Sequence, residues 1–129
     1  MDKTLWHNQL LEFPGAVWDY KEEWEWDRYR VDDKMFAALC QPGKEHAAQY
    51  ASHPLLSLKC DPLEAEALRL QYQDILPGFY MDKRTWISIR LDGCVPEALI
   101  SHLCQASYQL VFQKLTKKAQ QAILQASRA

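Results

Sequence analysis

Residues 77–93 combine a turn, a loop and a strand, and no other part of the chain constrains the fold as strongly. Pro77-Gly78 predicts a tight turn, because glycine can take the positive φ that a type II turn requires after proline. From Thr85 to Leu91, apolar residues alternate with polar or aromatic ones, as in a strand with one buried face. Asp92-Gly93 predicts the end of that strand. A cationic and aromatic group is therefore expected at a sheet edge, formed by Lys83, Arg84 and Trp86.

The rest of the chain predicts helices near both ends and strands between them. Strands are expected over residues 16–20, 24–31, 34–40, 55–60, 79–81 and 85–91. Helices are expected over residues 4–13, 62–73, 96–111 and 117–127. The clearest helix start is Asp61-Pro62, because an N-cap aspartate precedes proline at the first helical position. Clustered strands with flanking helices indicate an α+β fold, in which an antiparallel sheet carries helices on one face and leaves the other face open.

Two connections between these strands have recognisable sequences. Asp32-Asp33 predicts a two-residue turn between adjacent strands, although glycine in second place would be the stronger signal. Residues 41–54 form a polar insert bracketed by prolines and are expected to be a mobile loop. We see no interdomain linker, so residues 1–129 are expected to form a single domain.

The charge balance limits the kinds of partner that the chain can bind. Fifteen lysines and arginines face 17 aspartates and glutamates, which gives a net charge of −2. Proteins that coat nucleic acid by bulk charge are usually strongly basic. Any contact with nucleic acid is therefore expected to come from a local patch.

The cysteines and histidines predict neither a disulfide framework nor a metal site. The four cysteines form no C-x-x-C pair, and no two of the four histidines have metal-ligand spacing. Reduced and mostly buried cysteines are expected, together with a cytoplasmic location, since no signal segment or membrane-spanning apolar run is recognised. No nucleophile, base and orienting group can be named together, so we expect no enzyme and no cofactor. A monomer is slightly favoured.

Strand alternation also predicts which side chains lie on the open face. Trp86 and Arg90 are expected there, and so is Lys59 from the strand at 55–60. If Val31 points inward, Arg28 and Arg30 join the same face. Such a surface suits phosphate contacts, but cations on an exposed sheet also serve solubility and discourage edge pairing.

The order of short motifs along the chain resembles that of the MmcQ/YjbR family. The motifs are Phe13-Pro14-Gly15-Ala16, Lys34-Met35-Phe36-Ala37, Ser57-Leu58-Lys59-Cys60-Asp61-Pro62, Pro77-Gly78-Phe79-Tyr80-Met81-Asp82-Lys83-Arg84-Thr85-Trp86, Leu91-Asp92-Gly93 and Ser107-Tyr108. The resemblance extends from about Leu5 to Leu115. This chain has Asp82 where the family often has Asn, and Tyr80 and Thr85 where it often has His. Each difference makes the loop less cationic or more acidic.

The resemblance implies a bacterial, CyaY-like fold similar to frataxin, with an antiparallel sheet flanked by helices. Members of the family are commonly described as DNA-binding proteins with a double-wing arrangement. On this interpretation DNA binds through the basic and aromatic loop and the open sheet face, by contacts from Arg28, Arg30, Lys59, Lys83, Arg84, Trp86 and Arg90. The alternative is a protein-interaction domain whose open sheet face and Trp-rich hairpin bind a partner protein, with no role for nucleic acid.

Overall fold

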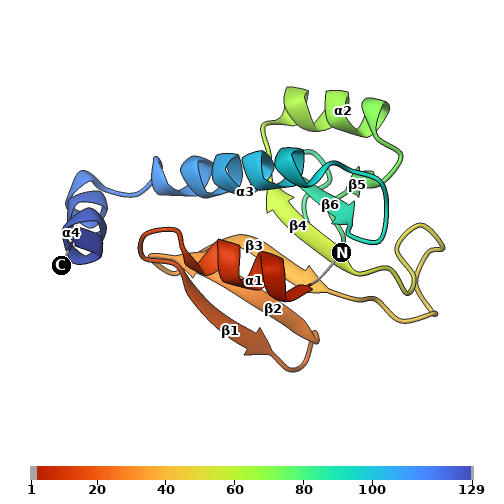
Figure 1. The fold of residues 1–129 in the computed structure, drawn as a ribbon, viewed down its shortest axis with the longest axis horizontal. Coiled ribbons are helices and arrows are strands. Elements are labelled where there is room, and N and C mark those ends of the chain that lie inside the picture. Colours follow the sequence, from red (N-terminus) through yellow and green to blue (C-terminus); the bar gives the residue numbers. More distant parts are fainter. Residues whose placement is uncertain (1–2, 129) are drawn as a thin grey trace.

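The computed structural model describes residues 3–128, which form one six-stranded sheet and four helices (Figure 1). The strands are β1 (Val17–Lys21), β2 (Trp26–Val31), β3 (Lys34–Cys40), β4 (Leu55–Lys59), β5 (Ile75–Pro77) and β6 (Trp86–Arg90). The helices are α1 (Lys3–Leu11), α2 (Pro62–Gln71), α3 (Glu97–Phe112) and α4 (Lys117–Arg128). All strand pairs are antiparallel and the order is β1-β2-β3-β4-β6-β5, so the predicted α+β class is confirmed.

The predicted strand over residues 79–81 is wrong, and a strand that was not predicted precedes it. Tyr80 has a φ of +53°, which no strand accommodates, so the chain from Phe79 to Met81 is a loop. The edge strand is instead β5, which ends at Pro77. Proline is tolerated there because an edge strand leaves some of its backbone N–H groups unpaired in any case.

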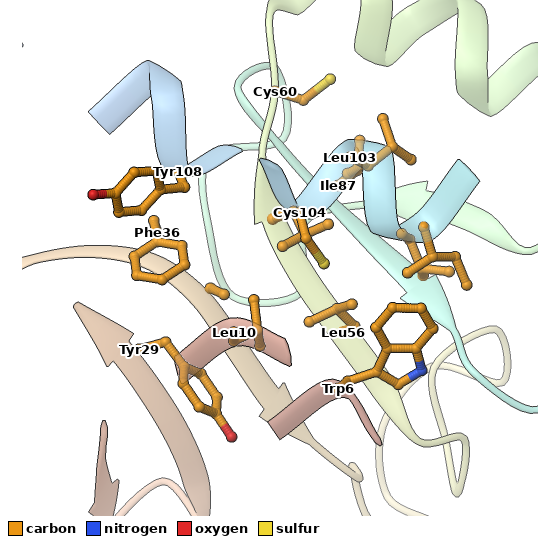
Figure 2. Packing of buried hydrophobic residues seen from close by; sticks show 14 of the residues in the cluster. Trp6, Leu10, Tyr29, Phe36, Leu56, Cys60, Ile87, Leu103, Cys104 and Tyr108 are labelled. Carbon is orange, nitrogen blue, oxygen red and sulfur yellow. The ribbon is translucent and has the colours of Figure 1, made fainter. Parts of the chain in front are cut away.

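The main core lies between one face of the sheet and the helices. Ile87 of β6 lies beside Leu103 of α3, and Phe36 of β3 lies beside Tyr108 of the same helix (Figure 2). Trp6 of α1 is fully buried in the same cluster. Alternation therefore predicted the buried faces of β4 and β6 correctly. Within residues 3–128, no helix has the length and apolar character needed to cross a membrane.

Ser107 joins α3 to two strands through buried hydrogen bonds. Its hydroxyl donates to the carbonyl oxygen of Phe36 at 2.6 Å and accepts from the backbone N–H of Lys59 at 2.8 Å. Each buried backbone group that is paired in this way avoids a desolvation cost of about 1–3 kcal/mol. A polar residue in the apolar stripe of α3 therefore sets how the helix sits on the sheet.

Loops, rather than helices, partly cover the second face of the sheet. Trp26, Leu55 and Leu76 pack there against Tyr50 and Phe79, which come from two different loops. The polar insert is thus not the free loop that its composition predicts. The Tyr50 hydroxyl donates to the carbonyl of Pro77 at 2.7 Å, and the loop closes on itself where the N–H of Ser52 donates to the carbonyl of Pro42 at 2.8 Å.

Two predicted turns differ in what determines their conformation: local sequence in one, and a tertiary contact in the other. Asp32 and Asp33 have φ values of +47° and +67°, as in a type I′ turn, so the predicted hairpin between β2 and β3 is confirmed. Gly78, in contrast, does not have a positive φ, and the predicted type II turn is wrong. Glycine is required there for space, because an added Cβ would lie 2.6 Å from the Cβ of Trp86.

Candidate functional site

Arg28 and Arg30 lie on the second face of the sheet, because Val31 is buried in the main core. Both arginines share a carboxylate on β1. Arg28 donates two hydrogen bonds to Asp19, at 2.9 and 2.5 Å, and Arg30 lies 3.4 Å from the same carboxylate and 3.1 Å from that of Asp33. The hydrogen bond from Arg28 lowers the pKa of Asp19 below its usual range. The two cations are therefore largely neutralised within the protein.

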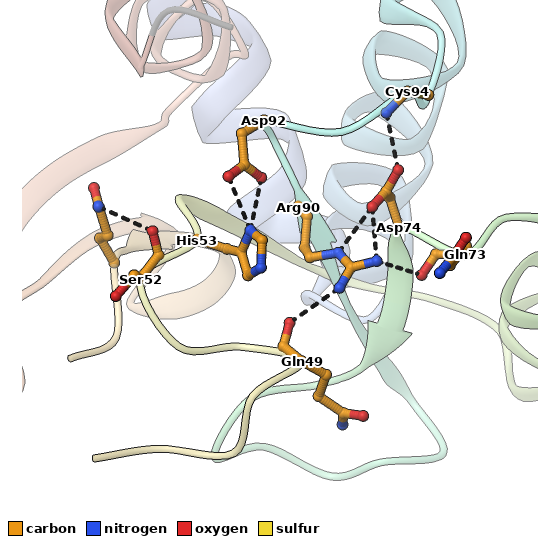
Figure 3. Close-up of polar contacts among 9 residues, drawn as sticks. Gln49, Ser52, His53, Gln73, Asp74, Arg90, Asp92 and Cys94 are labelled. Carbon is orange, nitrogen blue, oxygen red and sulfur yellow. Dashed lines mark hydrogen bonds and ion pairs between the residues drawn. The ribbon is translucent and has the colours of Figure 1, made fainter. Parts of the chain in front are cut away.

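Arg90 is held in a separate network at the far side of the sheet (Figure 3). Its guanidinium contacts the carboxylate of Asp74 at 2.8 Å and donates to the carbonyls of Gln73 and Gln49 at 3.1 and 3.4 Å. A hydrogen bond from the N–H of Cys94, reinforced by Arg90, lowers the pKa of Asp74. Arg90 is three strands from the β2 arginines, about 14 Å at the usual strand spacing.

Lys59 and Lys83, the two predicted lysines, are less available for contact with a ligand than free surface lysines would be. Lys59 lines a cavity of about 230 Å³ between α2 and α3, where burial and the charge of Lys114 lower its pKa. The ammonium group of Lys83 folds back onto the carbonyl of Gly78 and lies 5.6 Å from the ring centre of Tyr50. Lys83 therefore closes the loop that carries it.

Arg84 is the predicted cation that remains free at the surface. It is exposed, and its side chain forms no hydrogen bond or ion pair with any residue from 3 to 128. The sequence analysis missed Arg69 of α2, whose guanidinium donates to the carbonyl of Lys83 at 3.4 Å. Trp86 is half-buried beside Gly78. The seven predicted residues thus form no continuous basic surface, and Arg69, Lys83 and Arg84 make up a smaller cationic patch.

A cleft of about 580 Å³, which we call the aromatic cleft, also lies on the second face. Four segments line it: residues 24–26 at the start of β2, parts of β3, the 41–46 part of the insert, and the loop after β5. The residues are Trp24, Glu25, Trp26, Met35, Cys40, Gln41, Pro42, Gly43, Glu45, His46, Phe79, Tyr80 and Met81.

The rings of the aromatic cleft form a connected series of edge-on and tilted contacts. The ring centres of Trp24 and Trp26 are 5.3 Å apart. The ring centre of Phe79 lies 6.4 Å from that of Trp26 and 4.7 Å from that of Tyr80. Trp26 and Phe79 are 7% and 6% exposed, whereas Trp24 and Tyr80 are 50% and 73% exposed. The cleft therefore has a floor of buried rings and a rim of exposed ones.

The charges in the aromatic cleft are acidic. Glu25 and Glu45 line it, and within residues 3–128 no lysine or arginine does. The Nε2 atom of His46 lies 3.4 Å from the carboxylate of Glu45, and its ring packs edge-on against Phe79. In the described part of the chain, no group of three or more His, Cys, Asp or Glu residues is arranged to hold a metal ion.

Sequence reasoning identified only the part of the cleft that belongs to one hairpin. The Trp-rich segment was expected to carry a binding surface, and Trp24 and Trp26 do line the cleft. His46, Phe79 and Tyr80 were missed because they come from distant loops whose packing has no local signal. The one available hint was the unusual aromatic pair after the Pro-Gly turn.

Comparison with known proteins shows relatives over most of the chain. A model of the YjbR family matches residues 11–110. The Escherichia coli K12 "Uncharacterized protein YjbR" is 30% identical over 122 residues, which covers 92% of this chain and 97% of that protein. The Bacillus subtilis "Uncharacterized protein YyaQ" is 45% identical over 99 residues, 75% of this chain and 83% of that protein.

Solved structures show the same fold. The crystal structure of Deinococcus radiodurans protein DR2400, described as a DUF419 domain, matches with a TM-score of 0.77 at 28% identity and covers 92% of this chain and 84% of that one. A crystal structure of a Pseudomonas syringae protein matches with a TM-score of 0.74 at 23% identity, covering 85% of this chain and 98% of that one.

Proposed function

The chain belongs to the YjbR family, and from that premise we propose that it is a non-catalytic domain that binds a partner protein in the aromatic cleft. The observation that carries this proposal is the concave surface of about 580 Å³ lined by four aromatic side chains. Tryptophan, tyrosine and methionine are enriched in the centres of protein interfaces, where they provide large apolar contacts with few rotatable bonds. A partner's side chains can enter such a cleft without rearranging its floor.

The exposed rim strengthens the proposal. Trp24 and Tyr80 leave half or more of their surface in water, although apolar surface in contact with water is unfavourable. A partner that covers both rings would gain about 25 cal/mol for each Å² of apolar area removed from water. The predicted basic surface gives no comparable support, since Arg28, Arg30 and Arg90 are already paired with carboxylates.

DNA binding is the second candidate function, favoured by the cationic patch of Arg69, Lys83 and Arg84. Arg84 is free in the described structure, and Tyr80 is exposed in the same loop, where it could stack on a base. Three phosphate contacts would give a slope near −2.7 for log affinity against log salt. That slope is smaller than contacts from all six predicted cations would give.

A pair of tryptophan variants tests the proposed function. Trp24 lies in the cleft and is 50% exposed, whereas Trp18 lies on β1 and is 47% exposed, so Trp18→Ala is a matched control for Trp24→Ala. The partner is first captured from nuclease-treated cell extract, then purified and titrated by calorimetry. We expect Trp24→Ala to weaken its affinity by about 30-fold, as for an interface hot spot, and Trp18→Ala to weaken it far less.

The same proteins decide between the two candidates. A fluorescence titration with short duplex DNA is made at low and physiological salt, with Trp24→Ala and the Lys83→Ala/Arg84→Ala double variant. DNA binding that is lost in the double variant and retained in Trp24→Ala would favour the second candidate. Equal affinity of the purified partner for Trp24→Ala and wild type would refute the proposed function.

A further inference from the structure

We infer that the partner anchors itself in the aromatic cleft through an arginine side chain, whose guanidinium lies among the rings and pairs with Glu25 or Glu45. This inference rests on the proposed function, since it names the chemistry of the residue that the cleft receives. It is carried by the combination of exposed rings and carboxylates around one concavity. A purely apolar anchor would leave these carboxylates partly desolvated with no partner.

The charges around the cleft favour a cation. Glu25 and Glu45 are its charged lining residues, apart from His46, which can carry a charge only when protonated. Lys83 lines an adjoining hollow, where its ammonium group bonds to the carbonyl of Gly78, and the exposed Lys44 lies between the lining residues Gly43 and Glu45. Two other nearby cations already have carboxylate partners. Lys21 pairs with Glu23 at 2.9 Å, and Arg28 pairs with Asp19. The ionised side chains that line the cleft itself are therefore carboxylates, which favour a cationic anchor over an acidic one.

The rings add an attraction of their own. The face of an aromatic ring carries partial negative charge, and a guanidinium within about 6 Å of the ring centre is stabilised by it. This surface already contains such a contact, because the guanidinium carbon of Arg28 lies 5.6 Å from the ring centre of Trp24 while the same group pairs with Asp19. The cleft offers the same combination of ring and carboxylate to an arginine from outside.

Arginine fits this combination better than lysine does. Its guanidinium is flat, so one surface can stack on a ring while the edge donates hydrogen bonds to a carboxylate. The lysine ammonium is compact and strongly hydrated, and its burial among rings costs more. The length of the arginine stem also places apolar methylene groups against the floor rings Trp26 and Phe79.

Two small probes test the inference directly. The ¹⁵N-labelled protein is titrated with N-acetyl-arginine methylamide and, in parallel, with N-acetyl-citrulline methylamide, which has the same shape without the charge. The indole N–H signals of Trp24 and Trp26 report on the cleft, and those of Trp6 and Trp86 serve as internal controls. We expect saturable shifts of the cleft signals with arginine and at least tenfold weaker binding of citrulline.

A pair of charge variants identifies the carboxylates. Glu25→Gln with Glu45→Gln should weaken arginine binding by about fivefold or more. Glu22→Gln with Glu66→Gln removes the same two negative charges at exposed positions outside the cleft and should leave the affinity unchanged. This control separates the cleft carboxylates from the effect of net charge.

The outcomes distinguish this inference from the function on which it rests. Citrulline binding as tightly as arginine, or arginine binding equally well to both double variants, overturns the inference. So does an absence of arginine binding to wild-type protein while the purified partner still loses affinity with Trp24→Ala, and in that case the proposed function stands. If the purified partner binds Trp24→Ala with the same affinity as wild type, the calorimetric titration refutes the proposed function, whatever the arginine titration shows.

Discussion

Neighbouring residues of the loop between β5 and β6 have unrelated roles. Gly78 allows close contact with Trp86, Lys83 bonds back to the Gly78 carbonyl, and Arg84 points into water. The backbone N–H of Gly78 also donates to the carbonyl of Trp86 at 3.0 Å. The loop looks like one basic motif in the sequence. In the structure, however, Gly78 is a packing contact, Lys83 bonds to the loop backbone, and Arg84 is the cation without a partner among residues 3–128.

We predict that Gly78→Ala destabilises the protein by about 2 kcal/mol, as overpacking of a filled site does. The new methyl group would meet Trp86 Cβ at 2.6 Å and Met81 Cβ at 3.2 Å, and neither atom can move without the backbone. Gly43→Ala is the matched control, because its methyl group would meet the flexible carboxylate of Glu45. Urea unfolding should show a change of less than about 0.5 kcal/mol for Gly43→Ala. Similar losses for both variants would contradict this steric explanation.

At the scale of elements, the Asp74 carboxylate, which immediately precedes β5, bonds both to Arg90 at the end of β6 and to Cys94 in the segment after β6. Asp74 receives hydrogen bonds from the side chain of Arg90 and from the backbone N–H of Cys94, and its own carbonyl accepts from the N–H of Arg90. A second contact beside it links His53 to Asp92 at 2.8 Å (Figure 3). These contacts hold the insert loop and the edge of the sheet together.

The lowered pKa of Asp74 predicts a loss of stability in acid. Because the pKa is lower in the folded protein, the unfolded chain takes up the proton first as pH falls. The stabilisation is therefore complete above the unfolded pKa of about 3.9 and is lost as pH falls through the folded value. We expect Asp74→Asn to cost about 2 kcal/mol at pH 7 and to flatten the acid limb of the stability curve.

Urea unfolding between neutral pH and about pH 3 measures this effect. Asp33→Asn is the control, because the Asp33 side chain is 88% exposed and its positive φ suits asparagine. It should change stability by less than about 0.5 kcal/mol. An unchanged acid limb in Asp74→Asn would show that other carboxylates dominate acid unfolding.

At the scale of the whole molecule, the two faces of the sheet are held in different ways. One face carries the large core beneath α1 and α3 (Figures 1 and 2). The other face carries a small apolar cluster under loops. The aromatic cleft opens beside the small cluster, where Trp26 and Phe79 belong to both. The proposed binding site therefore lies on the face that buries the smaller apolar cluster.

This asymmetry predicts local opening of the insert loop without global unfolding. Regions with few buried apolar contacts open at a free energy below that of the whole protein. We expect the Ser52 amide, which donates to Pro42, to exchange with solvent faster than the amides of β4 in native-state hydrogen exchange. Tyr50→Phe removes the bond to Pro77 and should speed exchange at Ser52 about fivefold, for a loss near 1 kcal/mol. Exchange in α3 is the internal control, and equal acceleration there would contradict separate opening.

Much of the fold could be predicted from local sequence because local physics determines it. Asp61 accepts hydrogen bonds from the backbone N–H groups of Leu63 and Glu64, as expected of an N-cap before proline. The Asp32-Asp33 turn and the alternation through β6 depend likewise on residues within a few positions of one another. The exception is β5, a strand of three residues that is too short for alternation to show.

The sequence by itself determined which side chains of β4 and β6 face the main core, the start of α2 and the hairpin between β2 and β3, because each depends on the backbone preferences and side-chain pattern of adjacent residues. Only the tertiary structure decided that Asp19 and Asp74 neutralise Arg28, Arg30 and Arg90, since strand order and loop path bring those charges together from up to 16 positions apart. The aromatic cleft was decided in the same way. Its rings come from positions 24 to 80, and what places them side by side is burial of apolar area on the sheet, which depends on the completed fold.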